Sequence, residues 1–171
     1  MTTKSNLLKK FRIVLCKTSH AGNIGSVARA MKTMGFSDLY LVNPKDFPSD
    51  HANALSCGAE DILRKANVVS SLGAALKDIN HVIGFTARKR ELTQPHKNVR
   101  ELSEQLINEA SDNSIAIIFG NETNGLSNIE LQQCQTLGFI DASLKYSSLN
   151  LAHSVQIVCH EIRMMSNLPF K

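Results

Sequence analysis

The chain has few aromatic residues, no tryptophan and no long hydrophobic run. Phenylalanine and tyrosine together make up 5% of its 171 residues. No stretch approaches the roughly 18 consecutive apolar residues of a membrane-spanning helix. Residues 1–11 contain two leucines, where a secretory signal needs an apolar run of roughly 7–15 residues. We therefore expect a cytoplasmic protein with no membrane partner, in which residues 1–10 form a short basic arm.

The sequence also lacks any paired arrangement of its four cysteines. None of them belongs to a C-x-x-C pair or to a histidine spacing typical of metal sites (Cys16, Cys57, Cys134 and Cys159). This pattern favours reduced, buried thiols and predicts no bound metal. The net charge of +4 is compatible with an RNA partner but does not by itself indicate one.

The segment that most resembles a nucleotide-binding loop lacks the residues that such a loop requires. Residues 20–35 read HAGNIGSVARAMKTMG, and Gly25 is followed by serine and valine instead of the lysine of a Walker loop. A dinucleotide fingerprint would need G-x-G-x-x-G and an acidic residue about 20 positions later, and both are missing. The pattern predicts instead a helix over 24–35, capped by Asn23, with Arg29 on its exposed face.

Apolar, strand-like runs alternate with segments of helical periodicity along the chain. This alternation predicts an α/β fold with a mostly parallel sheet and helices on both faces. No repeat, low-complexity tract or linker interrupts it, so residues 1–171 are expected to form a single domain. The expected strands are 12–16, 38–42, 67–69, 81–85, 114–119 and 137–140, and the expected helices are 24–35, 50–58, 71–79, 98–111, 127–133 and 148–167.

Ligands of such sheets bind beyond the carboxyl ends of the strands, and four loops expected there are unusual. These loops are residues 18–23, 86–97, 120–127 and 141–150. In the third loop, Glu122 has no evident structural purpose, and Gly120 would allow a ligand to approach the backbone closely.

The last of these loops carries more polar groups than the following helix needs. Ser147, Ser148 and Asn150 all precede that helix, and one cap suffices, which leaves two polar groups for a ligand. In the loop after the fourth expected strand, the basic residues Arg88, Lys89 and Arg90 would suit RNA phosphates.

Three segments together resemble the motifs of the SPOUT superfamily, in its SpoU/TrmH branch of RNA ribose 2′-O-methyltransferases. The motifs are N-x-G-x-x-x-R at 23–29, G-x-E-x-x-G-L at 120–126 and S-L-N-L-A at 148–152. In this order, and each after an expected strand, they are specific. The resemblance extends from about Arg12 to Met165. Details such as LVNP and YSSLNLA are most similar to the enzymes that methylate the ribose at tRNA position 32, in the anticodon loop.

The resemblance implies the fold, the cofactor and the assembly of this branch. The fold would be the α/β knot, with a C-terminal trefoil knot that binds S-adenosylmethionine. The protein would be a homodimer that pairs through its first and last helices and acts on tRNA without a metal. The positions that match the cofactor contacts of the branch are Phe85, Thr86, Ala87, Gly120, Ile140, Ser147, Ser148 and Leu149.

Five positions match the catalytic residues of the branch: Arg29, Asn23, Ser148, Asn150 and Glu122. Because arginine is effectively always protonated, we expect Arg29 to clamp the ribose and a phosphate of RNA bound by the other subunit. That phosphate or Ser148 would relay the proton of the 2′-hydroxyl. Asn23 and Asn150 would orient the ribose, and Glu122 would hold the geometry of the loop or of the arginine by pairing with a cation.

Two departures and three alternatives accompany this interpretation. The position-32 enzymes usually carry a further C-terminal segment, which we expect to be absent here, and His153 replaces a small or apolar residue. The alternatives are the same reaction on ribosomal RNA or at another tRNA position, a non-catalytic RNA-binding homologue, and a nucleotide-dependent oxidoreductase.

Overall fold

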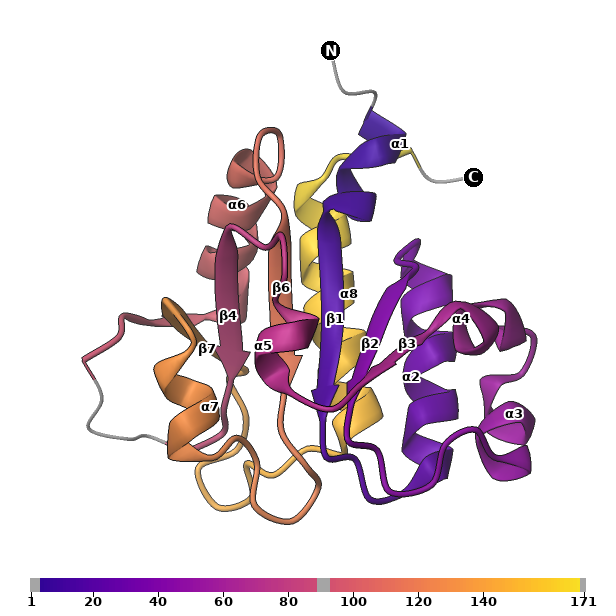
Figure 1. The fold of residues 1–171 in the computed structure, drawn as a ribbon. Coiled ribbons are helices and arrows are strands. Elements are labelled where there is room, and N and C mark those ends of the chain that lie inside the picture. Colours follow the sequence, from indigo (N-terminus) through magenta and orange to yellow (C-terminus); the bar gives the residue numbers. More distant parts are fainter. Residues whose placement is uncertain (1–3, 89–92, 170–171) are drawn as a thin grey trace.

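The computed structural model describes residues 4–88 and 93–169, which contain one parallel sheet of seven strands (Figure 1). The strand order is β3-β2-β1-β6-β4-β7-β5, and every neighbouring pair is parallel. The strands are β1 (Phe11–Cys16), β2 (Asp38–Val42), β3 (Asn67–Val69), β4 (His81–Phe85), β5 (His96–Asn98), β6 (Ile115–Phe119) and β7 (Thr136–Phe139).

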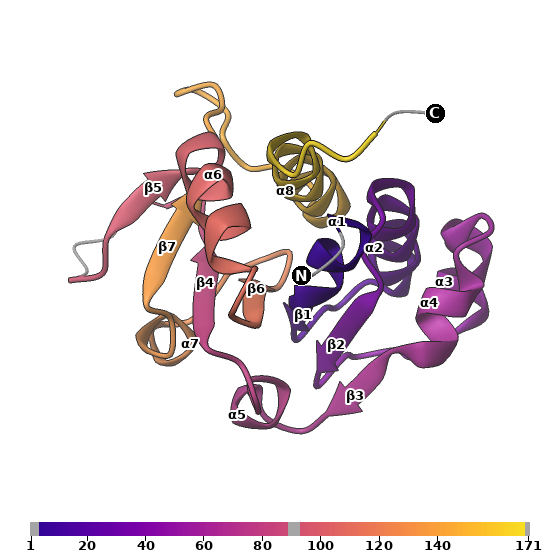
Figure 2. The same cartoon turned by 90° about the horizontal axis from the view of Figure 1, so that it is seen from above.

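Helices cover both faces of this sheet (Figure 2). The larger apolar core joins one face to α2 (Ala21–Met34), α3 (Asp50–Ser56), α4 (Glu60–Lys65), α6 (Val99–Glu109) and α8 (Leu151–Met165). The smaller core joins the other face to α5 (Leu72–Ala75) and α7 (Asn128–Gln132). The predicted α/β fold, with a parallel sheet and helices on both faces, is confirmed.

The central strand shows why the apolar pattern was informative. All five residues of β6 are buried, because the strand lies between β1 and β4 and is covered on both faces. A strand in that environment is an uninterrupted apolar run, as IAIIF is. Helix α2 likewise buries the predicted stripe, which includes Ile24, Val27 and Met31, and it ends at Gly35, whose φ of 86° is the left-handed conformation that favours glycine.

Strand β5, helix α4 and the N-terminal segment differ from the prediction. Strand β5 has the polar sequence HKN and was missed, because it is defined by pairing with β7 and not by its own pattern. Helix α4 was missed because it is only six residues long. The expected N-terminal arm is folded over residues 4–10, as α1 (Lys4–Leu7) and the 3₁₀ turn η1 (Leu8–Lys10). Its Leu8 is 2% exposed, so this segment belongs to the core.

The cysteines are all free, and three of them are buried. Burial raises the pKa of the Cys16 and Cys134 thiols to about 12, so both stay protonated and unreactive. Cys57 is exposed, against expectation.

Within residues 4–88 and 93–169, no helix has the length and apolar character needed to cross a membrane. The same residues contain no cluster of three or more histidine, cysteine or acidic side chains that could hold a metal ion.

Candidate functional site

The strands point their carboxyl ends to one end of the molecule, at the bottom of Figure 1, and a pocket of about 130 Å³ opens there. Its walls come from the ends of β4, β6 and β7, from the loops that follow them and from the start of α8. The lining residues are Phe85, Thr86, Ala87, Phe119, Gly120, Asn121, Glu122, Ile140, Ser147, Ser148, Leu149, Leu151 and Ser154. The structure therefore brings together all eight residues that were predicted to contact a cofactor.

Two aromatic rings form part of the pocket wall. Phe85 and Phe119, at the ends of adjacent strands, stack with ring centroids 5.5 Å apart and an interplanar angle of 16°. Gly138 makes room for this arrangement, since a Cβ atom there would lie 2.6 Å from the Phe85 ring. The pocket therefore has an apolar side, next to a rim of hydroxyl and backbone groups.

Gly120 serves the loop itself. A Cβ atom on Gly120 would lie 2.0 Å from the carbonyl carbon of Gly125, because the loop folds back on its own backbone. The Gly125 N–H donates to the Asn121 carbonyl oxygen at 3.0 Å and closes this turn. The close approach expected for a ligand is thus made by the protein chain. Glycine at position 120 determines the shape of the loop that carries Glu122.

Glu122 accepts four hydrogen bonds from the loop before α2. Its Oε2 accepts from the Ser19 N–H at 2.9 Å and the Ser19 hydroxyl at 2.8 Å. Its Oε1 accepts from the His20 N–H at 3.2 Å and from Asn23 Nδ2 at 2.9 Å. Burial alone would raise the pKa of this carboxyl group, but the hydrogen bonds, that of Asn23 foremost, lower it to about 2.

Glu122 holds loop geometry, as expected, but in the described part of the chain it does so through these neutral donors and forms no ion pair with a cation. The carboxylate instead lies at the N-terminus of α2, where the helix presents unpaired N–H groups and favours negative charge. His20, at the N-cap position, provides no side-chain cap. Glu122 therefore stabilises the start of α2 from a different loop, about a hundred residues along the chain.

Asn23 is not the helix cap that the sequence predicted, since α2 begins two residues earlier, at Ala21. Its side chain lies between the other two motifs. Asn23 Nδ2 donates to Glu122, and Asn23 Oδ1 accepts from Asn150 Nδ2 at 3.0 Å. Asn150 caps α8, because its Oδ1 accepts from the N–H groups of Ala152 and His153. One chain of hydrogen bonds thus connects all three motifs.

The serines of the third motif stay available for a ligand. Ser147 and Ser148 are exposed at the rim of the pocket. Asn150 is the cap, as expected for one of the three polar residues here. Neither serine hydroxyl is hydrogen-bonded to any residue in the described part of the chain. These hydroxyls can therefore donate to, or accept from, a bound molecule.

Neither Arg29 nor Arg88 lines this pocket. Arg29 is exposed on α2 and does not line the pocket of its own chain. It follows Asn23 by six residues, which is about 9 Å along the helix. Arg88 is exposed directly after Ala87, and its N–H donates to Thr86 Oγ1 at 3.2 Å. Lys89 and Arg90 lie outside the described residues.

Sequence reasoning missed Ser19 and Ser154. Ser19 gives Glu122 two of its four hydrogen bonds, and Ser154 lines the pocket one turn into α8. The position of Ser19 in the first unusual loop was the available signal, but no local pattern shows that its partner lies 103 residues away.

The fold and the pocket define an α/β protein with an open pocket at the carboxyl ends of its parallel strands. The chain belongs to the SpoU rRNA methylase family, whose sequence profile matches residues 10–160. It is 50% identical over 158 residues to a tRNA (cytidine/uridine-2′-O-)-methyltransferase TrmJ of Photorhabdus laumondii subsp. laumondii. The matched region covers 92% of this chain and 66% of that relative. The chain thus spans slightly less than two thirds of the length of such curated relatives.

Solved structures agree with this assignment. A probable methylase family protein from Haemophilus influenzae Rd KW20 has a TM-score of 0.88 and 48% identity, covering 93% of this chain and 67% of that one. TrmJ from Z. mobilis ZM4 has a TM-score of 0.85 and 32% identity, covering 94% and 71%.

Proposed function

We propose that this protein transfers a methyl group from S-adenosylmethionine to the ribose 2′-hydroxyl of tRNA, at cytidine or uridine 32 of the anticodon loop. The observation that carries the proposal is the pocket, where all eight predicted cofactor residues meet beside the hydrogen bonds that connect the three motifs. The TrmJ relatives, named as tRNA cytidine/uridine 2′-O-methyltransferases, support the substrate. Such a substrate would place the protein in the cytoplasm.

The residues of the pocket fit S-adenosylmethionine. Phe85, Ile140 and Leu149 offer an apolar surface to an adenine ring, and the hydroxyls of Ser147 and Ser148 have no partner among the described residues. The cofactor carries no phosphate, which agrees with the absence of a Walker lysine. When bound, it supplies an electrophilic methyl group on a sulfonium, a chemistry that requires no metal.

The remaining residues have positioning and proton-handling roles. The Ser148 hydroxyl, which has no partner among the described residues, would relay the proton of the ribose 2′-hydroxyl to an RNA phosphate. The Oδ1 atoms of Asn23 and Asn150 both accept hydrogen bonds from the protein, so the main effect of these residues on the ribose would be to hold the loops around it. Glu122 holds the loop of Ser19 in place.

Arg29 requires a second subunit for its role. The exposed surface of α2 includes Arg29, and the neighbouring α8 exposes His153 and His160 together with part of Ile157. We propose that these surfaces pair in a homodimer, in which Arg29 of one subunit reaches the pocket of its partner. There it would clamp the ribose and an RNA phosphate, for which its planar guanidinium is suited.

The proposed trefoil knot is consistent with the position of β7. This strand pairs with both β4 and β5, so it lies between two strands that residues 86–95 connect. A knot would form if a later part of the chain passed through the loop between β4 and β5. Mechanical unfolding between the termini tests this proposal, since a knotted chain extends to less than its full contour length.

The decisive experiment measures methyl transfer to tRNA transcripts together with cofactor binding. We expect one S-adenosylhomocysteine site per subunit by calorimetry, no binding of NAD, and methylation of a transcript with cytidine 32. A matched transcript with 2′-deoxycytidine at position 32 lacks the acceptor hydroxyl and should not be methylated.

Other outcomes separate the alternatives. Methylation that persists on the deoxy transcript would indicate another tRNA position. Transfer to ribosomal RNA alone would contradict the tRNA proposal. A folded protein that binds RNA but no S-adenosylhomocysteine would be a non-catalytic homologue.

A further inference from the structure

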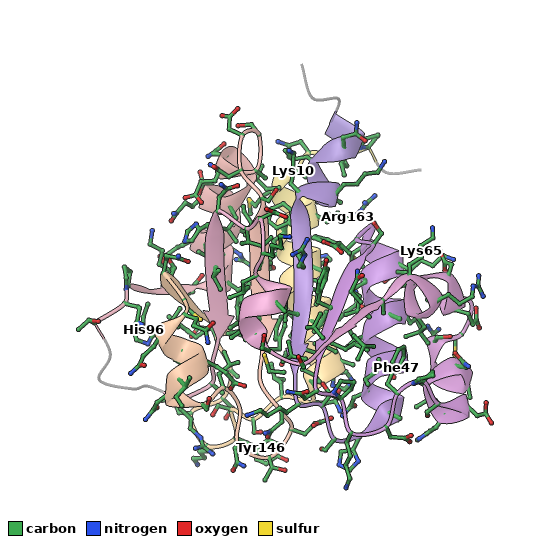
Figure 3. All side chains as sticks on the ribbon, viewed as in Figure 1. Lys10, Phe47, Lys65, His96, Tyr146 and Arg163 are labelled. Atoms are coloured by element: carbon green, nitrogen blue, oxygen red, sulfur yellow. The ribbon has the colours of Figure 1, made fainter. Side chains whose placement is uncertain are left out.

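The turn of residues 143–146 exposes apolar side chains immediately beside the pocket. Leu144 is 102% exposed and Tyr146 is 81% exposed. Tyr146 is the only aromatic residue among the exposed large hydrophobic side chains of the described part of the chain. Figure 3 shows it at the end of the molecule where the strands end. No role assigned so far to the site uses this ring.

Backbone hydrogen bonds hold Tyr146 in place without burying its ring. The Tyr146 N–H donates to the Ser143 carbonyl oxygen at 3.1 Å, and Ser143 and Tyr146 form an isolated antiparallel bridge. The Lys145 N–H donates to Ser143 Oγ at 3.3 Å. The turn is therefore ordered by its main chain and the Ser143 hydroxyl, and the side chains of Lys145 and Tyr146 have no hydrogen-bond partner among the described residues.

The position of the ring suits the nucleotide that reacts. A single residue, Ser147, separates Tyr146 from Ser148, so their Cα atoms are at most roughly 7 Å apart. Ser148 lines the pocket in which the methyl donor is proposed to bind. A ribose next to Ser148 carries its base on the adjacent C1′ atom, which places that base in the vicinity of Tyr146.

The charges around the ring favour RNA over an apolar protein surface. Lys145 precedes Tyr146 and is exposed, and the exposed Arg88 directly follows Thr86 and Ala87, which line the pocket. The acidic residue of this loop, Asp141, lies five positions before Tyr146. Exposed aromatic rings next to basic side chains are typical of sites for unpaired nucleotides, whose bases stack on the ring.

We propose that Tyr146 stacks on the base of the nucleotide whose ribose is methylated, with Lys145 contacting a neighbouring phosphate; this inference rests on the proposed function. Stacking uses the face of a base and is tolerant of sequence. One ring can therefore stack equally well on cytidine and on uridine. These are the two nucleotides in the names of the TrmJ relatives.

The test compares three variants in the full chain: Tyr146→Ala, Tyr146→Phe and the control Ile129→Ala. Ile129 is an exposed apolar residue of similar exposure, 73%, on α7 and outside the pocket lining. We expect Tyr146→Ala to lower kcat/KM for tRNA on the order of 10- to 100-fold, by the same factor for cytidine 32 and uridine 32. Tyr146→Phe and Ile129→Ala should stay near wild type, and S-adenosylhomocysteine affinity should be unchanged in all three.

A binding readout keeps this inference separate from the proposed activity. With the fluorescent base pyrrolocytidine at position 32 of an anticodon stem-loop, wild type should quench the fluorescence, and Tyr146→Ala should not. Lys145→Ala should reduce the slope of log affinity against log salt by about one phosphate contact.

Two results would overturn the inference, and a third would separate it from the proposed function. Equal kcat/KM and equal quenching in wild type and Tyr146→Ala would do so while leaving the methyltransferase proposal intact. Dissociation of a dimer in Tyr146→Ala, measured by analytical ultracentrifugation, would show that a second copy of the chain covers the ring. A wild type that quenches without methylating any tRNA would refute the proposed function and support the stacking site.

Discussion

Replacing Glu122 with glutamine is expected to destabilise the protein at neutral pH, and the loss should shrink as the pH falls. The carboxylate accepts four hydrogen bonds, two on each oxygen. Glutamine keeps only one of the two oxygens. Its NH₂ group replaces the second oxygen, so two protein donors there would face another donor and lose their acceptor. Asn23 cannot reverse its amide to compensate without losing the bond from Asn150.

The pKa of Glu122 sets the size of this effect. A fall from 4.5 to about 2 corresponds to at most about 3.4 kcal/mol in favour of the ionised form. Because the side chain is partly exposed, solvent screening reduces this to roughly 1–2 kcal/mol. The folded-state pKa lies below the unfolded one, so this stability is present above about pH 5 and is lost as the pH falls towards 2.

Urea unfolding of both proteins, followed by circular dichroism at pH 7 and pH 3, measures the effect. The difference in unfolding free energy should fall at pH 3 to less than half of its value at pH 7. Other carboxylates titrate in both proteins and cancel in the difference. Glu104→Gln is the matched control, since Glu104 is exposed on α6 without a hydrogen bond to any described residue. A difference for Glu122→Gln that is constant from pH 7 to pH 3 would refute the reasoning.

Three further predictions concern the same end of the sheet. Gly120→Ala should lower the free energy of unfolding by roughly 1–3 kcal/mol and weaken S-adenosylhomocysteine binding, because the new Cβ atom would overlap the loop backbone. Gly73→Ala is the control: a Cβ atom there meets no other atom within 4 Å, so urea unfolding should show no change in stability. Asn150→Asp keeps the cap of α8 but sets an oxygen against Asn23 Oδ1, so calorimetry should show weaker cofactor binding while helix content by circular dichroism is retained. Arg29→Lys should leave stability unchanged and lower turnover on tRNA by more than tenfold; near-normal turnover would contradict the clamp.

Much of the fold could be predicted because strand and helix patterns are local. Six of the expected strands are present, and IAIIF marked the middle of the sheet because burial on both faces demands a continuous apolar run. Strand β5 escaped prediction, since three polar residues become a strand only when β7 lies beside them. Asn23 was misread as a cap because its neighbours permit that role.

The sequence by itself determined the six apolar strands, the loops that follow them and the residue types that those loops present. The resemblance to the SpoU/TrmH branch pointed to eight residues around a cofactor, and the structure brings these eight together in one pocket. The tertiary structure alone decided the order of the strands and the partners of Glu122 and Asn150. Those partners lie 99 to 103 and 127 residues away. A hydrogen bond acts over about 3 Å, so the chemistry of such a carboxylate depends on which distant loop the fold brings next to it.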